Sequence, residues 1–240
     1  MAIILNNLGY DLIITAKDEE NLIKLKQKLN LNNKNDVYII VKDLSKENEC
    51  KELYEEIKDK FKNIDILINN AGFGLFGEFV DTSIDTQMNM IDVNIKAVQI
   101  LTKLFLNDMV KVNKGRILNV ASVAAFMPGP LMATYYSTKN YVLRISQAIK
   151  YELKKRKSNV KISVLCPGPV NTNFNNVANV KFNLKGMSSK YVAEYAIDKL
   201  LKDKFLIMPG VGIKLIRFIS KILPDMIMAK MCYKMQEKKK

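Results

Sequence analysis

The sequence predicts an α/β fold in which helices cover both faces of a parallel, doubly wound sheet. Short apolar runs rich in β-branched residues alternate with longer amphipathic stretches, as in sheets that are buried on both faces. A chain of 240 residues is also long enough for one large domain. Ligands of such folds bind beyond the carboxyl ends of the strands, so functional side chains are expected directly after each apolar run.

The elements follow from periodicity, and the whole chain, residues 1–240, is predicted to form a single domain. The expected strands are residues 11–16, 37–41, 65–69, 116–121, 160–166 and 205–208. The expected helices are residues 18–30, 46–61, 83–112, 133–156 and 189–202.

Composition narrows the possible chemistry. Histidine is absent, which excludes serine–histidine–aspartate catalysis, cysteine–histidine catalysis and zinc sites that use histidine. Cys50, Cys166 and Cys232 are far apart and form no CxxC pair, so neither a disulfide framework nor a metal site is indicated. Acid–base chemistry must therefore use Tyr, Lys, Asp, Glu or Cys.

The formal net charge of +14 raises the possibility of nucleic-acid binding. The lysines are dispersed, many of them alternate with acids, and no nucleic-acid-binding motif accompanies them, so we expect no nucleic-acid partner. The start resembles no signal peptide, and no run of about 18 apolar residues exists. We therefore expect a cytoplasmic protein.

Residues 72–77 read Gly-x-Gly-x-x-Gly after a predicted strand, which nominally matches a dinucleotide-binding loop. In such a loop the helix begins within the motif, so that its N–H groups reach the pyrophosphate. Here the next helix-start signal is at Asp81, Thr82 and Ser83. We therefore reject these residues as a phosphate loop and expect a pocket wall.

Candidate catalytic residues follow the strand at 116–121. Ser122 stands directly after it, and the i, i+4 spacing of Tyr135 and Lys139 places a phenol and an ammonium on one helix face. A phenol with a pKa of about 10 is a poor acid–base group at neutral pH, and a neighbouring cation favours the phenolate. Such a pair is common by chance, but motifs at neighbouring strand ends favour an active site.

Together these motifs resemble the short-chain dehydrogenase/reductase family over about residues 1–202. The matching motifs are Asn69-Asn70-Ala71-Gly72, Asn94, Ser122, Tyr135-x-x-x-Lys139 and Pro167-Gly168. The resemblance implies a Rossmann-like sheet, NAD(P) as cofactor and interconversion of a carbonyl and a secondary alcohol on a small-molecule substrate. We also expect a homo-oligomer.

The resemblance implies roles for individual residues. Tyr135 would exchange a proton with the substrate oxygen, and Ser122 would hydrogen-bond that oxygen. Lys139 would hold the nicotinamide ribose and lower the pKa of Tyr135, and Asn94 would order a water relay to Lys139. The other expected cofactor-binding residues are Asp43, Asn69, Ala71, Gly72, Pro167, Gly168, Val170 and Thr172.

Charge at the end of the first apolar run bears on the choice of cofactor. An acid at this position of a doubly wound fold binds the ribose 2′-hydroxyl of NAD, whereas a base accommodates the 2′-phosphate of NADP. The run ends in Ala16 and Lys17, which favours NADP over NAD. The alternative is a lysine that is only solvated.

The sequence departs from the family at its start. The family's first strand and its Thr-Gly-x-x-x-Gly-x-Gly loop are not found, and residues 1–9 resemble only the end of the first helix. Loss of this central strand would leave two strands without a neighbour and the pyrophosphate without a helix N-terminus. We expect either a reading frame that begins further upstream, which the retained Ser-Tyr-Lys-Asn set favours, or a degenerate paralogue. As written, the chain should bind NADP weakly and be poorly stable.

Residues 205–240 are expected to form the last strand and a basic amphipathic extension. Residues 199–240 contain 11 Lys or Arg and 3 Asp or Glu, and the bases at 214, 217 and 221 share one helix face before Pro224. One explanation is a pair of helices that cover the substrate cleft or a subunit interface. The other is docking of residues 213–240 on an anionic membrane. We favour the first.

The sequence therefore predicts an NADP-preferring oxidoreductase that acts on an apolar substrate by Tyr/Lys/Ser catalysis. The expected apolar residues are Phe73, Phe76, Phe79, Phe126, Met127 and the C-terminal methionines, and the loop at 173–190 should cover the substrate. The alternatives are a non-catalytic scaffold built on a damaged Rossmann-like sheet and a basic protein that binds membrane surfaces or polyanions.

Overall fold

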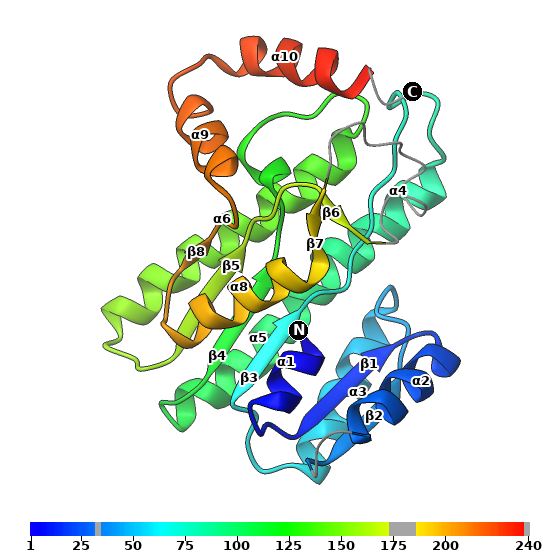
Figure 1. Ribbon diagram of the computed structural model, residues 1–240, viewed down its shortest axis with the longest axis vertical. Coiled ribbons are helices and arrows are strands. Elements are labelled where there is room, and N and C mark those ends of the chain that lie inside the picture. The colour runs from blue at the N-terminus through cyan, green and yellow to red at the C-terminus, as the bar shows by residue number, and fades with distance from the viewer. Residues whose placement is uncertain (32–34, 173–185, 238–240) are drawn as a thin grey trace.

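The computed structural model describes residues 1–31, 35–172 and 186–237, and Figure 1 shows its arrangement. Its strands form two main parallel sheets, with the orders β1–β2 and β3–β4–β5–β8. Their bounds are β1 (Leu12–Ala16), β2 (Val37–Val41), β3 (Ile66–Asn69), β4 (Arg116–Val120), β5 (Lys161–Leu165) and β8 (Leu206–Ile207). Each expected strand is present within one residue of its predicted bounds, and the parallel α/β class is confirmed.

Helices pack on both faces of this strand layer (Figure 1). One face carries α1 (Ala2–Asn7), α2 (Glu19–Asn30) and α8 (Ser189–Leu201), and the other carries α3 (Glu47–Lys60), α5 (Val98–Lys111) and α6 (Ala133–Lys155). Leu12 and Val37 of the smaller sheet share one buried cluster with Leu118 and Leu165 of the larger sheet. The two sheets therefore contribute to one hydrophobic core.

The two strands at the junction of the sheets, β1 and β3, are less buried than β4 and β5. β1 pairs only with β2 and β3 only with β4, and no strand in the described part of the chain pairs with both β1 and β3. Ile14 of β1 and Ile68 of β3 are half-buried, whereas Ile117 and Leu118 of β4 are fully buried. These are the two strands for which the sequence predicts no common neighbour.

The helical pattern at 83–112 divides into three consecutive segments. α4 (Ile84–Ile91) is followed by η1 (Asp92–Ala97), which is π-helical, and then by α5. Ser83 caps α4 by accepting the N–H of Thr86, which agrees with the predicted start. The sequence did not predict the π-helical turn, which contains Asn94, and such turns occur frequently at functional sites.

The remaining described elements lie near the carboxyl ends of β4 and β5 and at the end of the chain. They are η2 (Val123–Phe126), β6 (Val170–Asn171), β7 (Met187–Ser188), α9 (Val211–Ile219) and α10 (Asp225–Glu237). The expected substrate loop falls largely on residues 173–185, which lie outside the described residues, as do residues 238–240. No helix of the described chain is long and apolar enough to span a membrane.

The approach to α6 offers a test of packing. A Cβ added at Gly129 would lie 2.1 Å from Cγ of the buried Tyr136 ring, whereas one added at Gly212 on α9 would meet nothing within 4 Å. We expect Gly129→Ala to lower the free energy of unfolding by about 1–3 kcal/mol through overpacking. Gly212→Ala should instead raise it by up to about 1 kcal/mol, because alanine favours a helix. Chemical denaturation of both variants measures this, and equal stabilities would contradict the packing.

Candidate active site

The carboxyl end of β4 and the first turns of α6 bring three expected catalytic residues together. Ser122 follows β4, and its Oγ accepts the N–H of Ala124 at 3.1 Å, which leaves its own proton available. The hydroxyl groups of Ser122 and Tyr135 are hydrogen-bonded to each other. The Nζ of Lys139 lies 5.8 Å from the centre of the Tyr135 ring. A hydroxyl, a phenol and an ammonium thus share one site.

Burial controls the protonation of this site. It raises the pKa of Tyr135 to about 12, and the hydrogen bond from Ser122 opposes this only in part. The expected net lowering of this pKa is therefore wrong for this structure, because burial of the phenol outweighs the influence of the neighbouring groups. The ammonium of Lys139 donates to the carbonyl of Val120 at 3.1 Å, and its own burial lowers the pKa of Lys139 to about 8. The phenol is consequently held in its protonated form at neutral pH.

Asn94 is fully buried in the π-helical turn and joins two parts of the site. Its Nδ2 donates to the carbonyl of Phe73 at 2.9 Å and to Oγ1 of Thr138 at 3.0 Å, and its Oδ1 accepts the N–H of Phe73 at 3.1 Å. Thr138 in turn donates to the carbonyl of Tyr135 at 2.7 Å. Asn94 therefore fixes the loop after β3 against the helix that carries Tyr135 and Lys139.

Two further residues of the site, Thr138 and Val120, are not indicated by the sequence. Thr138 lies between Tyr135 and Lys139 on α6, but a threonine within a helix gives no specific signal, because its hydroxyl commonly bonds to the backbone of its own helix. Val120 acts through its carbonyl oxygen, and a backbone acceptor cannot be recognised from the residue type.

Gly72 lies against both Asn94 and Lys139. A Cβ added at this position would come within 2.8 Å of Asn94 Oδ1 and 3.1 Å of Lys139 Nζ. Gly72 and the preceding Ala71 are exposed at this edge of the sheet. The missing side chain therefore lets the loop approach the buried ammonium closely.

The side chain of Asn69 faces the protein interior. Its Nδ2 donates to Thr102 Oγ1 at 3.0 Å and to Asn119 Oδ1 at 2.8 Å, and Asn119 donates to Ser146 Oγ at 3.0 Å. This buried network connects β3, β4, α5 and α6. The hydrogen bonds hold the side chain of Asn69 in the sheet, so a contact of this residue with a cofactor would have to use its backbone.

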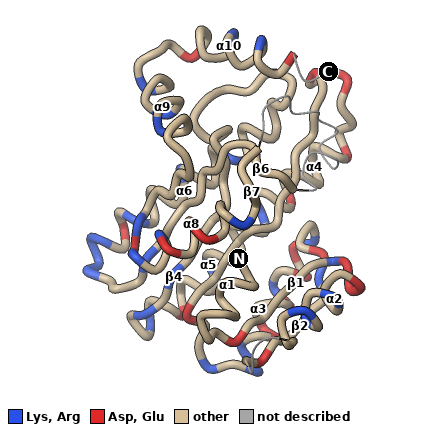
Figure 2. Tube along the Cα trace, in the orientation of Figure 1, with Lys and Arg blue, Asp and Glu red and all other residues tan. Residues whose placement is uncertain are grey.

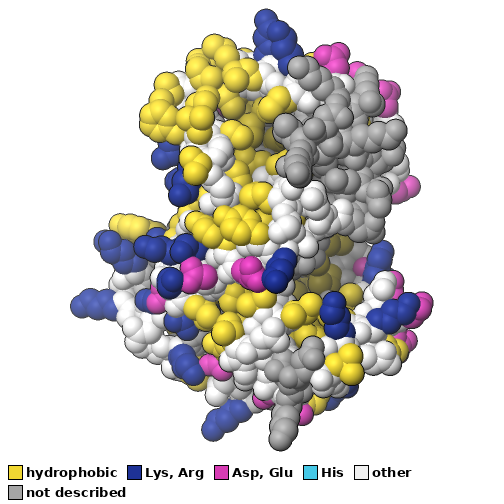
Figure 3. All heavy atoms as spheres, in the orientation of Figure 1, with side chains coloured by type: hydrophobic (Ala, Val, Ile, Leu, Met, Phe, Trp, Pro, Cys, Tyr) yellow, Lys and Arg dark blue, Asp and Glu magenta, His cyan; other side chains and the backbone are white. Residues whose placement is uncertain are grey.

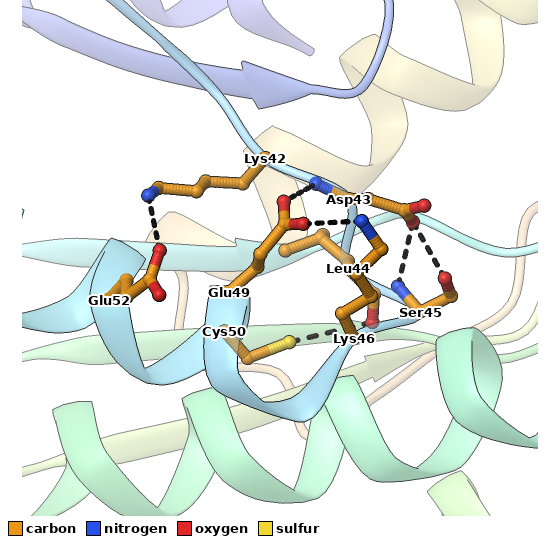
Figure 4. A network of polar contacts seen from close by, with 8 residues as sticks. All are labelled: Lys42, Asp43, Leu44, Ser45, Lys46, Glu49, Cys50 and Glu52. Carbon is orange, nitrogen blue, oxygen red and sulfur yellow. Dashed lines mark hydrogen bonds and ion pairs between the residues drawn. The ribbon is translucent and has the colours of Figure 1, made fainter.

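Lys17 directly follows β1, and Asp43 lies two residues after the end of β2. The carboxylate of Asp43 accepts both the N–H of Ser45 at 3.0 Å and its hydroxyl at 2.8 Å, as Figure 4 shows. These hydrogen bonds lower the pKa of Asp43, and the nearby charge of Lys17 lowers it further. Asp43 is thus a fixed, ionised acceptor, and Lys17 is an exposed cation beside it.

The turn after β5 contacts the segment that carries Ser122. Pro167 accepts the N–H of Val123, next to Ser122, at 2.8 Å, and a Cβ added at Gly168 would contact Ile213 of α9 at 3.4 Å. Val170 begins β6, and Thr172 is exposed at the end of the described segment. The buried thiol of Cys166 has its pKa raised to about 12 by burial, so it remains protonated.

These positions fit the two ends of a nicotinamide dinucleotide. Lys17 and Asp43 lie at one end of the row of strand ends, and the pair Tyr135 and Lys139 lies further along it, where doubly wound folds bind ligands. No glycine-rich loop opens a helix between them in the part of the chain that the structure describes. The residues expected to bind the adenine and the nicotinamide therefore lie at two places along this edge, and the described residues include no glycine-rich cradle for the pyrophosphate between them.

Comparison with known proteins agrees with this geometry. The family model described as short chain dehydrogenase matches residues 1–181. An uncharacterized oxidoreductase of Staphylococcus saprophyticus is 32% identical over 168 residues, which are 70% of this chain and 71% of that protein.

Solved structures show the same fold. A short-chain dehydrogenase from Sphingobium yanoikuyae in complex with NADPH is 25% identical, with a TM-score of 0.82 over 88% of this chain and 82% of that chain. A short-chain dehydrogenase/reductase from Burkholderia phymatum in complex with NAD is 22% identical, with a TM-score of 0.80 over 88% of this chain and 84% of that chain, which supports the fold alone. The protein belongs to the short-chain dehydrogenase family of NAD(P)-dependent oxidoreductases.

Proposed function

We propose that the protein is an NADP-preferring oxidoreductase that interconverts a carbonyl and a secondary alcohol on an apolar substrate. The observation that carries this proposal is the hydrogen bond between Ser122 and Tyr135 beside the buried ammonium of Lys139. These groups provide a hydrogen-bond donor, a proton donor and a cation around one point. A carbonyl oxygen needs all three as negative charge develops on it during reduction.

Each side chain has a distinct task in this reaction. A bound nicotinamide cofactor supplies the hydride for the carbonyl carbon. Ser122 donates a hydrogen bond to the carbonyl oxygen, and Tyr135 transfers its phenolic proton to the same oxygen to give the alcohol. Lys139 then stabilises the phenolate that remains and binds the ribose. Asn94 holds the loop after β3 beside Lys139 and orders the water that returns a proton.

Apolar residues around Tyr135 support an apolar substrate. The cluster that includes Met127 and Tyr136 is packed against half-buried side chains from the loop after β3, from η2, from α6 and from the C-terminal region. These half-buried residues are Phe76, Val123, Tyr135, Ile216, Ile219 and Leu223. Phe126 packs in a neighbouring cluster, whereas Phe79 is exposed.

Lys17 provides a test of the cofactor preference. Its exposed ammonium beside Asp43 suits the 2′-phosphate of NADP, which NAD lacks. We expect Lys17→Ala to weaken NADPH binding about tenfold, the size of one charge-assisted hydrogen bond, and to leave NADH binding unchanged. Fluorescence titration of both cofactors measures this, and Lys28→Ala, which removes an exposed lysine of α2, is the control. Equal losses for the two cofactors would contradict the assignment.

The reaction itself is tested by NADPH oxidation in the presence of a panel of apolar ketones. Turnover that depends on a ketone supports the oxidoreductase. NADPH binding without turnover of any ketone or secondary alcohol would favour the non-catalytic scaffold instead. A second protein carries an added N-terminal strand and Thr-Gly-x-x-x-Gly-x-Gly loop. If the chain is inactive only because it binds the cofactor weakly, this extension should restore turnover. If the active site itself is incompetent, the extension should have no effect on turnover.

A further inference from the structure

The C-terminal helices α9 and α10 have two apolar faces, and the inner face is packed against the domain. Ile213 of α9 and Met228 and Cys232 of α10 are buried, and Met228 and Cys232 contact the cluster around Tyr136. The side chain of Gln236 donates a hydrogen bond to the Tyr136 hydroxyl. The helices are thereby attached to the wall of the candidate active site.

The outer face of the same helices is also apolar and is exposed, as Figure 3 shows above α9 and α10. We call it the C-terminal apolar face. It consists of Val211, Leu215, Phe218, Ile222, Met226, Ile227, Met231 and Met235. Phe218 is 62% exposed and Met226 is 80% exposed, so these side chains are directed to solvent. Large contiguous apolar patches of this kind mark interaction sites on soluble proteins.

Exposed lysines lie on α9, on α10 and in the segment between them, and Figure 2 marks basic positions along both helices. They are Lys214, Lys221, Lys230 and Lys234. None of them forms an ion pair in the described part of the chain, and residues 32–34, 173–185 and 238–240 contain no Asp or Glu. These lysines are therefore available to an external anion.

We infer that the C-terminal apolar face docks on an anionic lipid surface. Apolar side chains flanked by lysines are the composition of helices that lie in the membrane interface, where the apolar groups enter the acyl boundary and the cations contact acidic headgroups. A second copy of this chain fits less well, because a two-fold contact would bring the same lysines together at a cost.

This placement has a geometric consequence for the site. Ile216 and Ile219 of α9 pack against the same buried cluster as Tyr135, so the docked face lies next to the wall of the site. An apolar substrate could then enter from the lipid phase. The docking itself does not depend on the proposed reaction, since it uses neither cofactor nor catalytic residues.

Flotation with vesicles of phosphatidylglycerol and phosphatidylcholine tests the inference. The test variant changes Lys214, Lys221, Lys230 and Lys234 to Gln. The control changes four exposed lysines elsewhere to Gln, namely Lys103, Lys154, Lys155 and Lys157. Both lose the same net charge. We expect the test variant to lose about 100-fold or more in partition coefficient and the control to retain most of its binding.

A second pair of variants tests the apolar contribution. The test variant is Leu215→Ser with Phe218→Ser and Met226→Ser, and the control replaces the exposed residues Leu31, Val80 and Val112 by Ser. Only the first should lose vesicle binding. The inference is overturned by absence of binding to anionic vesicles, by equal losses in test and control variants, or by a dimer in solution that the test substitutions dissociate.

Discussion

Tyr135→Phe should lower kcat/KM for ketone reduction by about 100-fold to 10,000-fold, the usual contribution of a general acid. The substitution removes only the phenolic oxygen that is hydrogen-bonded to Ser122. The ring remains to pack beside the Tyr136 ring, whose centre lies 6.1 Å away. Cofactor affinity and the free energy of unfolding should therefore change little. Steady-state kinetics with saturating NADPH, together with denaturation, measure the two effects separately.

Tyr136→Phe is the matched control, because this tyrosine is adjacent, aromatic and buried. Its hydroxyl accepts a hydrogen bond from the fully buried Gln236, so its removal leaves a buried amide with one partner fewer. We expect a loss of about 1–3 kcal/mol in the free energy of unfolding and little change in kcat/KM. A similar loss of activity in both variants would show that Tyr135 acts through packing and would contradict its role as the proton donor.

The pH dependence of reduction follows from the same burial. Because burial raises the pKa of Tyr135 to about 12, the phenol stays protonated throughout the neutral range. In the free protein, Lys139 is the group of the site that changes charge near neutrality, with a pKa lowered to about 8. The profile of kcat/KM for reduction should therefore fall as pH rises through about 8, and no phenol titration should appear below that value.

The fold was predictable because each strand carries its own signal. The run at 37–41 is β-branched at every position except Tyr38, and it forms β2 with the same bounds. Ser83 was recognisable as a helix start because a capping side chain is a local feature. The π-helical turn at 92–97 was not predictable, because one extra residue in a turn hardly alters the hydrophobic period.

The site was predictable as a set of positions but not in its electrostatics. Ser122, Tyr135 and Lys139 could be placed together because strand ends and helix spacing are encoded locally. The sign of the pKa shift at Tyr135 depends on how completely the fold removes water from the phenol, which spacing does not report. The inward direction of Asn69 likewise depends on partners in Thr102 and Asn119, far away in the sequence.

Lys139→Met should abolish most activity and yet stabilise the protein. The ammonium is buried without a described acidic partner, and desolvation lowers its pKa from 10.5 to about 8. This shift corresponds to a penalty of about 3 kcal/mol on the folded state below pH 8. Loss of the hydrogen bond to the Val120 carbonyl costs the variant about 1 kcal/mol. The free energy of unfolding of the variant should therefore be higher by about 2 kcal/mol at pH 7. The same change should lower kcat/KM by about 100-fold or more.

The stability difference between Lys139→Met and the unaltered protein should also depend on pH in one direction. Between pH 8 and 10.5 the unfolded chain holds a proton on this lysine that the folded chain has released. Stability of the unaltered protein therefore rises with pH across this window, and the advantage of the methionine variant disappears. Lys154→Met, on the exposed side of the same helix, should show neither effect. Denaturation curves at pH 7, 9 and 10.5 decide this, and a less stable Lys139→Met at pH 7 would mean that the ammonium supports the fold as well as the chemistry.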